Sequence, residues 1–156
     1  MPATHEMTDT NRIEKEVQLR ASKSRVWRAL TDAAEFGSWF GLKLEGPFVL
    51  GKPVSGKVTS PGYEHLVLEL TVETVEPQDL FAYRWHPHAL DTSVDYSTEA
   101  TTLVEFRLYE IADGTRLTVV ESGFDNLSPE RRALALVGND KGWTSQMERI
   151  RRHVDG

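Results

Sequence analysis

The C-terminal part of the sequence predicts one long amphipathic helix that follows a run of strands. A strand over 117–124 is succeeded by Ser128 and Pro129, which suit the N-cap and the first position of a helix. One apolar stripe then recurs at helical spacing: Trp143, Met147, Ile150 and Val154. Such a helix must lie on the sheet to bury its stripe, and a curved sheet around one helix can leave a cavity for a small ligand.

Length and composition are those of one domain with a substantial core. The 156 residues carry a formal net charge of −6, which argues against nucleic acid or an anionic membrane surface as a partner. The absence of cysteine excludes disulfides and thiolate metal sites and favours a cytoplasmic location. No stretch approaches about 18 apolar residues, so we expect no membrane span. We expect 1–11, which lacks a signal-peptide pattern, to be a disordered tail and 12–156 to form a single domain.

Hydrophobic alternation and turn residues place the remaining elements. The predicted order is a strand over 12–20, helices over 22–30 and 33–39, and strands over 47–50, 53–59, 65–75, 80–86, 101–111 and 115–124. Asp113-Gly114 is a strong hairpin signal between the last two strands. The polar segment 87–100 is predicted to be a functional or a mobile loop. The fold class is therefore α+β, with the order β-α-α-β6-α and an antiparallel sheet.

Several short strings occur in order along nearly the whole chain: Val26-Trp27-Arg28-Ala29-Leu30-Thr31-Asp32, Trp39 with Gly41, Tyr83-Arg84-Trp85, Gly114-Thr115-Arg116-Leu117-Thr118, Glu121-Ser122-Gly123-Phe124 and Gly142-Trp143. With the element order, they resemble the family related to the C-terminal domain of the Hsp90 ATPase activator, within the START and Bet v 1-like superfamily. The resemblance implies a helix-grip fold, in which a curved antiparallel sheet wraps around the long C-terminal helix. It also implies a hydrophobic cavity, and the Hsp90 activator suggests a role in stress response.

Glu121 is the first candidate for chemistry. It shares strand parity with Leu117 and Val119, so it faces the interior if they do. A carboxylate that faces an apolar cavity needs hydrogen-bond partners or stays neutral. It would then anchor a ligand or act as a general acid or base. The alternative is a side chain at the open end of the strand, solvated or paired with an arginine.

Large aromatic residues are the other candidates for a ligand site. Ligand pockets are mostly apolar with a few polar groups, whereas ordinary core packing uses the same residue types. We expect Trp27 and Phe106 to pack in the core. The predicted ligand-binding set is Trp39, Tyr83, Trp85, Glu121, Trp143 and Met147, with core packing as the alternative for its aromatic members.

His86 and His88 flank a proline at the end of an aromatic strand, near Asp91 and Asp95. Imidazole and carboxylate groups suit zinc, but no third ligand stands at a diagnostic spacing. We therefore expect no metal site and no cofactor. The sequence also lacks the motifs of a serine hydrolase and of a phosphate-binding loop.

Three functions compete on this evidence. The first is the binding of a hydrophobic or aromatic small molecule in a cavity between the sheet and the C-terminal helix. The second is an enzyme that acts on such a ligand in the same cavity. The third is a protein-interaction domain, by analogy with the Hsp90 activator. The sequence does not decide whether the chain forms a homodimer. Because inward-facing polar residues are few, we favour the first.

Overall fold

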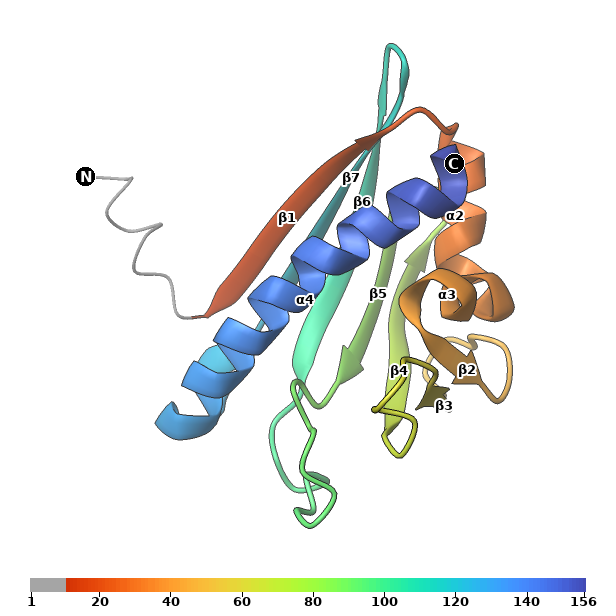
Figure 1. Cartoon of the computed structure of the whole chain (residues 1–156). Helices are drawn as coiled ribbons and strands as arrows, with labels where there is room; N and C mark the ends of the chain where they lie inside the picture. The colour runs from red at the N-terminus through yellow and green to blue at the C-terminus, as the bar shows by residue number, and fades with distance from the viewer. Residues whose placement is uncertain (1–10) are drawn as a thin grey trace, which may run out of the picture.

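One seven-stranded antiparallel sheet and a long C-terminal helix dominate the computed structural model, which describes residues 11–156 (Figure 1). In chain order the elements are β1 (Arg12–Leu19), α2 (Lys23–Thr31), α3 (Ala33–Phe40), β2 (Leu42–Leu44), β3 (Pro53–Val58), β4 (Val67–Glu76), β5 (Leu80–Trp85), β6 (Thr102–Ile111), β7 (Gly114–Ser122), the 3-10 turn η1 (Phe124–Asn126) and α4 (Pro129–Asp155). The predicted α+β class and the order β-α-α-β6-α are confirmed.

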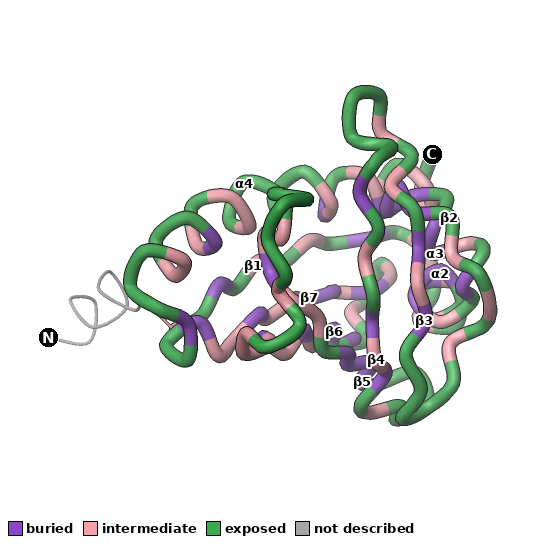
Figure 2. Tube along the Cα trace, turned by 90° about the horizontal axis from the view of Figure 1, so that it is seen from below, coloured by how far each residue is buried: buried purple, intermediate pink, exposed green. Residues whose placement is uncertain are grey.

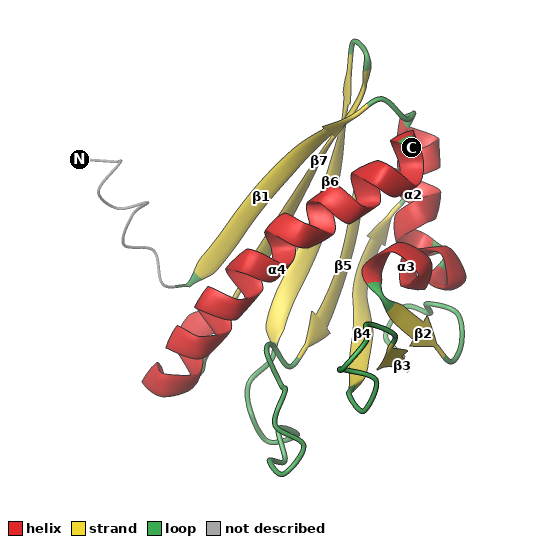
Figure 3. Cartoon of the chain, viewed as in Figure 1, coloured by secondary structure: helices red, strands yellow, loops and turns green. Residues whose placement is uncertain are grey.

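The sheet has the strand order β1-β7-β6-β5-β4-β3-β2, and every neighbouring pair is antiparallel. Its long strands curve, and α4 runs obliquely across one face, with α2 and α3 beside its C-terminal end (Figures 1 and 3). This is the helix-grip arrangement. Among the described helices, none is long and apolar enough to cross a membrane.

A capping residue stands at the start of each of the three predicted helices. The side chain of Ser22 accepts from the Arg25 N–H at the start of α2, and Asp32 does the same for Glu35 in α3. Ser128 caps α4, with a proline at its first positions. Satisfying these free N–H groups contributes roughly 1 kcal/mol per cap.

One predicted strand was wrong and another was missed. The segment 47–50 has no strand structure, whereas Leu42–Leu44 forms β2 and pairs with the end of β3. Pro47 has no N–H to offer a neighbouring strand, so the segment serves as a loop. The alternation Leu42-Lys43-Leu44 is only three residues long and directly follows α3, so it gives a weak strand signal.

The predicted disordered tail, 1–11, mostly falls outside the described residues. Asn11, its last residue, is described, and its carbonyl accepts from the N–H of Gly123 at 3.0 Å. The disorder of the tail therefore stays a prediction.

The core lies between the inner face of the sheet and the three helices, as the purple segments in Figure 2 show. β7 buries Leu117, Val119 and Glu121 together, which confirms the predicted parity. From α4, Trp143, Met147 and Ile150 are buried against this core, as the apolar stripe predicted. Fully burying side chains of this size contributes roughly 1.5–3 kcal/mol each.

Candidate functional site

A buried carboxylate with four donors stands at the centre of the candidate site. Glu121 is 0% exposed in β7. Its Oε2 accepts from the indole N–H of Trp85 at 2.7 Å and from the hydroxyl of Thr102 at 2.5 Å. Its Oε1 accepts from the amide N–H of Asn139 at 2.9 Å and from the indole N–H of Trp143 at 2.8 Å. All four partners are neutral side chains, so hydrogen bonds rather than a counter-charge satisfy this carboxylate.

Sheet register and the helical period bring the four donors together. Trp85 ends β5 and lies opposite Thr102, the first residue of β6. Asn139 and Trp143 are four residues apart on α4, so their side chains leave the same face of the helix. Glu121 of β7 therefore connects β5, β6 and α4 at one point of the core.

Tyr83 lies beside this network without joining it. Its side chain is fully buried in β5, and its hydroxyl has no hydrogen-bond partner among residues 11–156. Burial, and then the negative charge of Glu121, raise the pKa of the Tyr83 phenol well above its ordinary value. A phenol held neutral in this way packs as an aromatic wall of the core.

A small cavity, here called the inner hollow, lies between the sheet and α4. Its volume is about 160 Å³. The lining residues are Phe40, Leu68, Trp85, Asn139, Gly142, Trp143 and Gln146. The ring centroids of Trp85 and Trp143 are 5.9 Å apart, too close for another ring to insert between them. A ligand ring in the inner hollow would therefore lie against these indoles.

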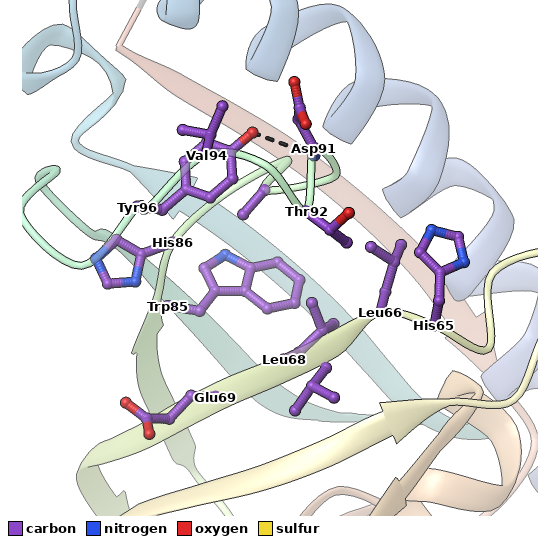
Figure 4. Close-up of a pocket in the computed structure, with 12 residues that line it drawn as sticks. His65, Leu66, Leu68, Glu69, Trp85, His86, Asp91, Thr92, Val94 and Tyr96 are labelled. Carbon is purple, nitrogen blue, oxygen red and sulfur yellow. Dashed lines mark hydrogen bonds between the residues drawn. The ribbon is translucent and has the colours of Figure 1, made fainter.

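A second cavity, the outer hollow, opens beside the first, beneath the segment between β5 and β6 (Figure 4). Its volume is about 330 Å³. Leu68 and Trp85 line both hollows, and Figure 4 shows the Trp85 indole between β4 and the loop. The outer hollow also has polar walls, which include His65, His86 and Asp91.

The loop that covers the outer hollow is attached to α4. The Arg131 guanidinium donates to both carboxylate oxygens of Glu99 at 2.8 Å and to the backbone carbonyls of Pro87 and His88. It also lies 4.9 Å from the centroid of the Tyr96 ring. These contacts hold both ends of the loop with one side chain from α4.

His88 packs closely against the same helix. A Cβ atom at Gly138 would lie 2.4 Å from the His88 ring, so glycine is what allows this approach. Gly138 and Gly142 both lie inside α4, where glycine weakens a helix but can permit close packing. α4 is continuous through both, and Gly138 serves close packing.

The six predicted site residues lie at different depths. Trp85 and Trp143 line the inner hollow, and Glu121 lies behind them as their hydrogen-bond partner. Tyr83 and Met147 are buried and line neither hollow. Trp39 is also buried away from both, with its indole N–H donating to the carbonyl of Ala29 at 2.9 Å. The role of all six residues in ligand binding stays a prediction.

Sequence reasoning missed several lining residues, among them Asn139 and Gln146. Asn139 could have been found, because it precedes Trp143 by one helical turn on the inward face. No comparable signal exists for Phe40 or Leu68, which look like ordinary core residues. Within 11–156, no group of three or more metal-ligating side chains is close enough to hold a metal ion.

Solved structures of other proteins have the same fold. Protein MLL2253 from Mesorhizobium loti is 24% identical over 91% of this chain and 95% of its own, with a TM-score of 0.71. A protein from Arthrobacter aurescens is 18% identical over 94% of this chain and 88% of its own, with a TM-score of 0.77. The Aha1 dimer from Colwellia psychrerythraea is 14% identical over 92% of this chain and 96% of its own, with a TM-score of 0.68. A comparison with curated proteins gave no match.

A family model also matches the sequence itself. It is described as activator of Hsp90 ATPase homolog 1-like protein, and the match spans residues 20–155. This range contains Glu121, its four donors and all residues that line the two hollows. The chain therefore belongs to the activator of Hsp90 ATPase homolog 1-like family.

Proposed function

We propose that this protein binds a small hydrophobic or aromatic molecule between the sheet and α4. The inner hollow carries the proposal, because its walls combine Phe40, Leu68 and two indoles with only two polar side chains. Mostly apolar walls with a few polar groups are typical of small-molecule sites. Its volume of about 160 Å³ suits one aromatic ring, and a larger ligand would extend past Trp85 into the outer hollow.

Filling the inner hollow tests this function. Leu68→Trp should weaken the binding of a hydrophobic fluorescent probe by at least about tenfold, while Val75→Trp should leave it unchanged. Val75 belongs to the same strand but is exposed and lines neither hollow, so it is the matched control. The wild-type protein should bind such probes in the micromolar range, about −8 kcal/mol. Equal binding by wild type and Leu68→Trp would remove the inner hollow as the site.

Native mass spectrometry of the protein from a cell extract identifies the ligand itself. A retained small molecule of unchanged mass supports binding. Conversion of that molecule on incubation with purified protein would instead indicate an enzyme, with catalytic groups sought among the polar walls of the outer hollow.

A protein-interaction function is the second candidate. Leu134 and Val137 are about 60% exposed and lie three residues apart on α4, so they form a small apolar patch. The partner would be a second copy of the chain, since one solved structure of this fold is described as a dimer. Sedimentation of the wild type against Leu134→Lys tests this, with a concentration-dependent dimer expected for the wild type alone.

A further inference from the structure

The two amide side chains of the inner hollow are held so that their oxygens remain available. Asn139 donates its amide N–H to Glu121 at 2.9 Å, and Gln146 donates its own to the carbonyl of Phe40 at 2.9 Å. Carbonyl and carboxylate oxygens accept but do not donate in these bonds, so each contact fixes which end of the amide faces it. The amide oxygens of Asn139 and Gln146 are therefore the groups left for a ligand.

Neither amide oxygen has a donor among the described residues. The Gln146 oxygen is buried and has no hydrogen-bond partner within 11–156. An unpaired buried acceptor is costly, and a ligand donor removes that cost. Asn139, Gly142, Trp143 and Gln146 recur along one face of α4, so both amide side chains line the same apolar space.

The charges around the site disfavour an anion. Among residues 11–156, no lysine or arginine lines either hollow, whereas Glu69 and Asp91 line the outer hollow. Glu121 adds a negative charge directly behind the indoles of the inner hollow. An anionic ligand would lose its hydration there without gaining a counter-charge.

Resting on the ligand-binding function above, we propose that the ligand is a neutral or cationic aromatic molecule with an N–H or O–H donor. Asn139 and Gln146 are the residues that select it. Aromatic ethers and aromatic carboxylates of the same shape bind less tightly, the ethers because they lack a donor and the carboxylates because they are negatively charged.

Three two-ring probes of nearly one shape, which would extend from the inner hollow past Trp85 into the outer hollow, separate these effects: 2-naphthol, 2-methoxynaphthalene and 2-naphthoate, each titrated at neutral pH by calorimetry. The wild type should bind 2-naphthol about two- to tenfold more tightly than the ether, the range of one neutral hydrogen bond. The naphthoate should bind more weakly than either. Equal affinity for naphthol and ether, or tightest binding of the naphthoate, would overturn this proposal and leave the ligand-binding function intact. If none of the three probes binds, both this proposal and the ligand-binding function are contradicted.

Gln146→Met gives the residue-level test, because methionine has a similar length and no amide oxygen. It should lower the naphthol affinity toward that of the ether and leave ether affinity unchanged. The unchanged ether affinity shows that the hollow is intact in the variant. Gln18→Met, on the exposed face of β1, is the matched control and should retain the naphthol preference. A full naphthol preference in Gln146→Met would exclude Gln146 as a selecting residue.

Discussion

The indole N–H of Trp143 donates to Oε1 of Glu121 over 2.8 Å, and this bond joins α4 to β7 inside the core. The indole of Trp85 donates to the other oxygen of the same carboxylate. One buried side chain thereby orients both indole walls of the inner hollow. Glu121 therefore shapes the inner hollow without lining it.

Glu121→Gln should destabilise the protein substantially. A glutamine side chain offers one acceptor oxygen, and its NH₂ group would face two of the four donors that now bind the carboxylate. Leaving two buried donors unpaired should lower the free energy of unfolding by about 2–4 kcal/mol, measured by urea denaturation. Glu105→Gln, at a partly exposed position on β6, is the control. A loss within about 0.5 kcal/mol, the range of surface substitutions, would contradict this account.

Tyr83→Phe should be neutral or stabilising at neutral pH. The substitution removes a buried hydroxyl that has no partner within 11–156 and keeps the ring. The free energy of unfolding should stay unchanged or rise by up to about 1 kcal/mol. Tyr109→Phe, at an exposed position on β6, controls for the loss of a phenol. Clear destabilisation of Tyr83→Phe would mean that its hydroxyl is hydrogen bonded in solution.

The raised pKa of Tyr83 predicts a change at alkaline pH. The folded protein holds this proton more tightly than the unfolded chain does, first because of burial and then because of Glu121. Its contribution to stability is complete below the ordinary tyrosine pKa of 10.0 and is lost as the pH rises above it. Ultraviolet titration should show one tyrosine that ionises late, and Tyr83→Phe should remove that late step. Normal ionisation of every tyrosine would refute the shift.

Trp143→Ala should cost about 3–5 kcal/mol of unfolding free energy, the range for large core side chains. Trp143 is 2% exposed, and its removal also leaves Glu121 with one donor fewer. Trp143→Phe keeps most of the ring volume and should therefore cost less. A loss below roughly 1 kcal/mol for Trp143→Ala, measured by urea denaturation, would mean that the ring contributes little to the core.

The elements that the sequence predicted well are those with local signals. Ser128 and Pro129 mark the start of α4, and Asp113-Gly114 marks the last hairpin, because caps and turns depend on adjacent residues. The inward direction of Glu121 also followed from local alternation with Leu117 and Val119.

The partners of Glu121 could not be predicted in the same way. Thr102, Trp85 and Asn139 lie 18 to 36 residues away from it in the sequence, and only the assembled sheet and helix bring them together. The depth of each aromatic residue also depends on tertiary packing. Trp39 is buried against α2, although its residue type suits a pocket wall equally well.

Arg131→Ala should release the loop over the outer hollow. Arg131 donates to Glu99, Pro87 and His88, so its removal deprives three loop residues of a donor from α4. Hydrogen exchange of the backbone amides of 87–100 should accelerate, while exchange in β6 and β7 stays unchanged. Arg152→Ala, an exposed position near the end of α4, is the control. Unchanged exchange in the loop would show that other contacts hold it.

The attachment of the loop to α4 also affects the pKa of His88. Burial, and then the positive charge of Arg131, lower the pKa of the His88 imidazole from its ordinary value of 6.5. The folded state therefore disfavours the protonated ring. The stability that His88 contributes is complete above pH 6.5 and is lost as the pH falls through its folded-state pKa.

An NMR titration of the histidine ring protons tests this directly. The His88 signal should shift at a pH below 6.5 in the wild type. In Arg131→Ala the midpoint should move upward, because the positive charge is gone and a looser loop admits more water to the ring. Arg152→Ala should leave the midpoint where it is in the wild type. A wild-type midpoint above 6.5, or one that Arg131→Ala does not move, would show that His88 is not held between the loop and α4 in solution.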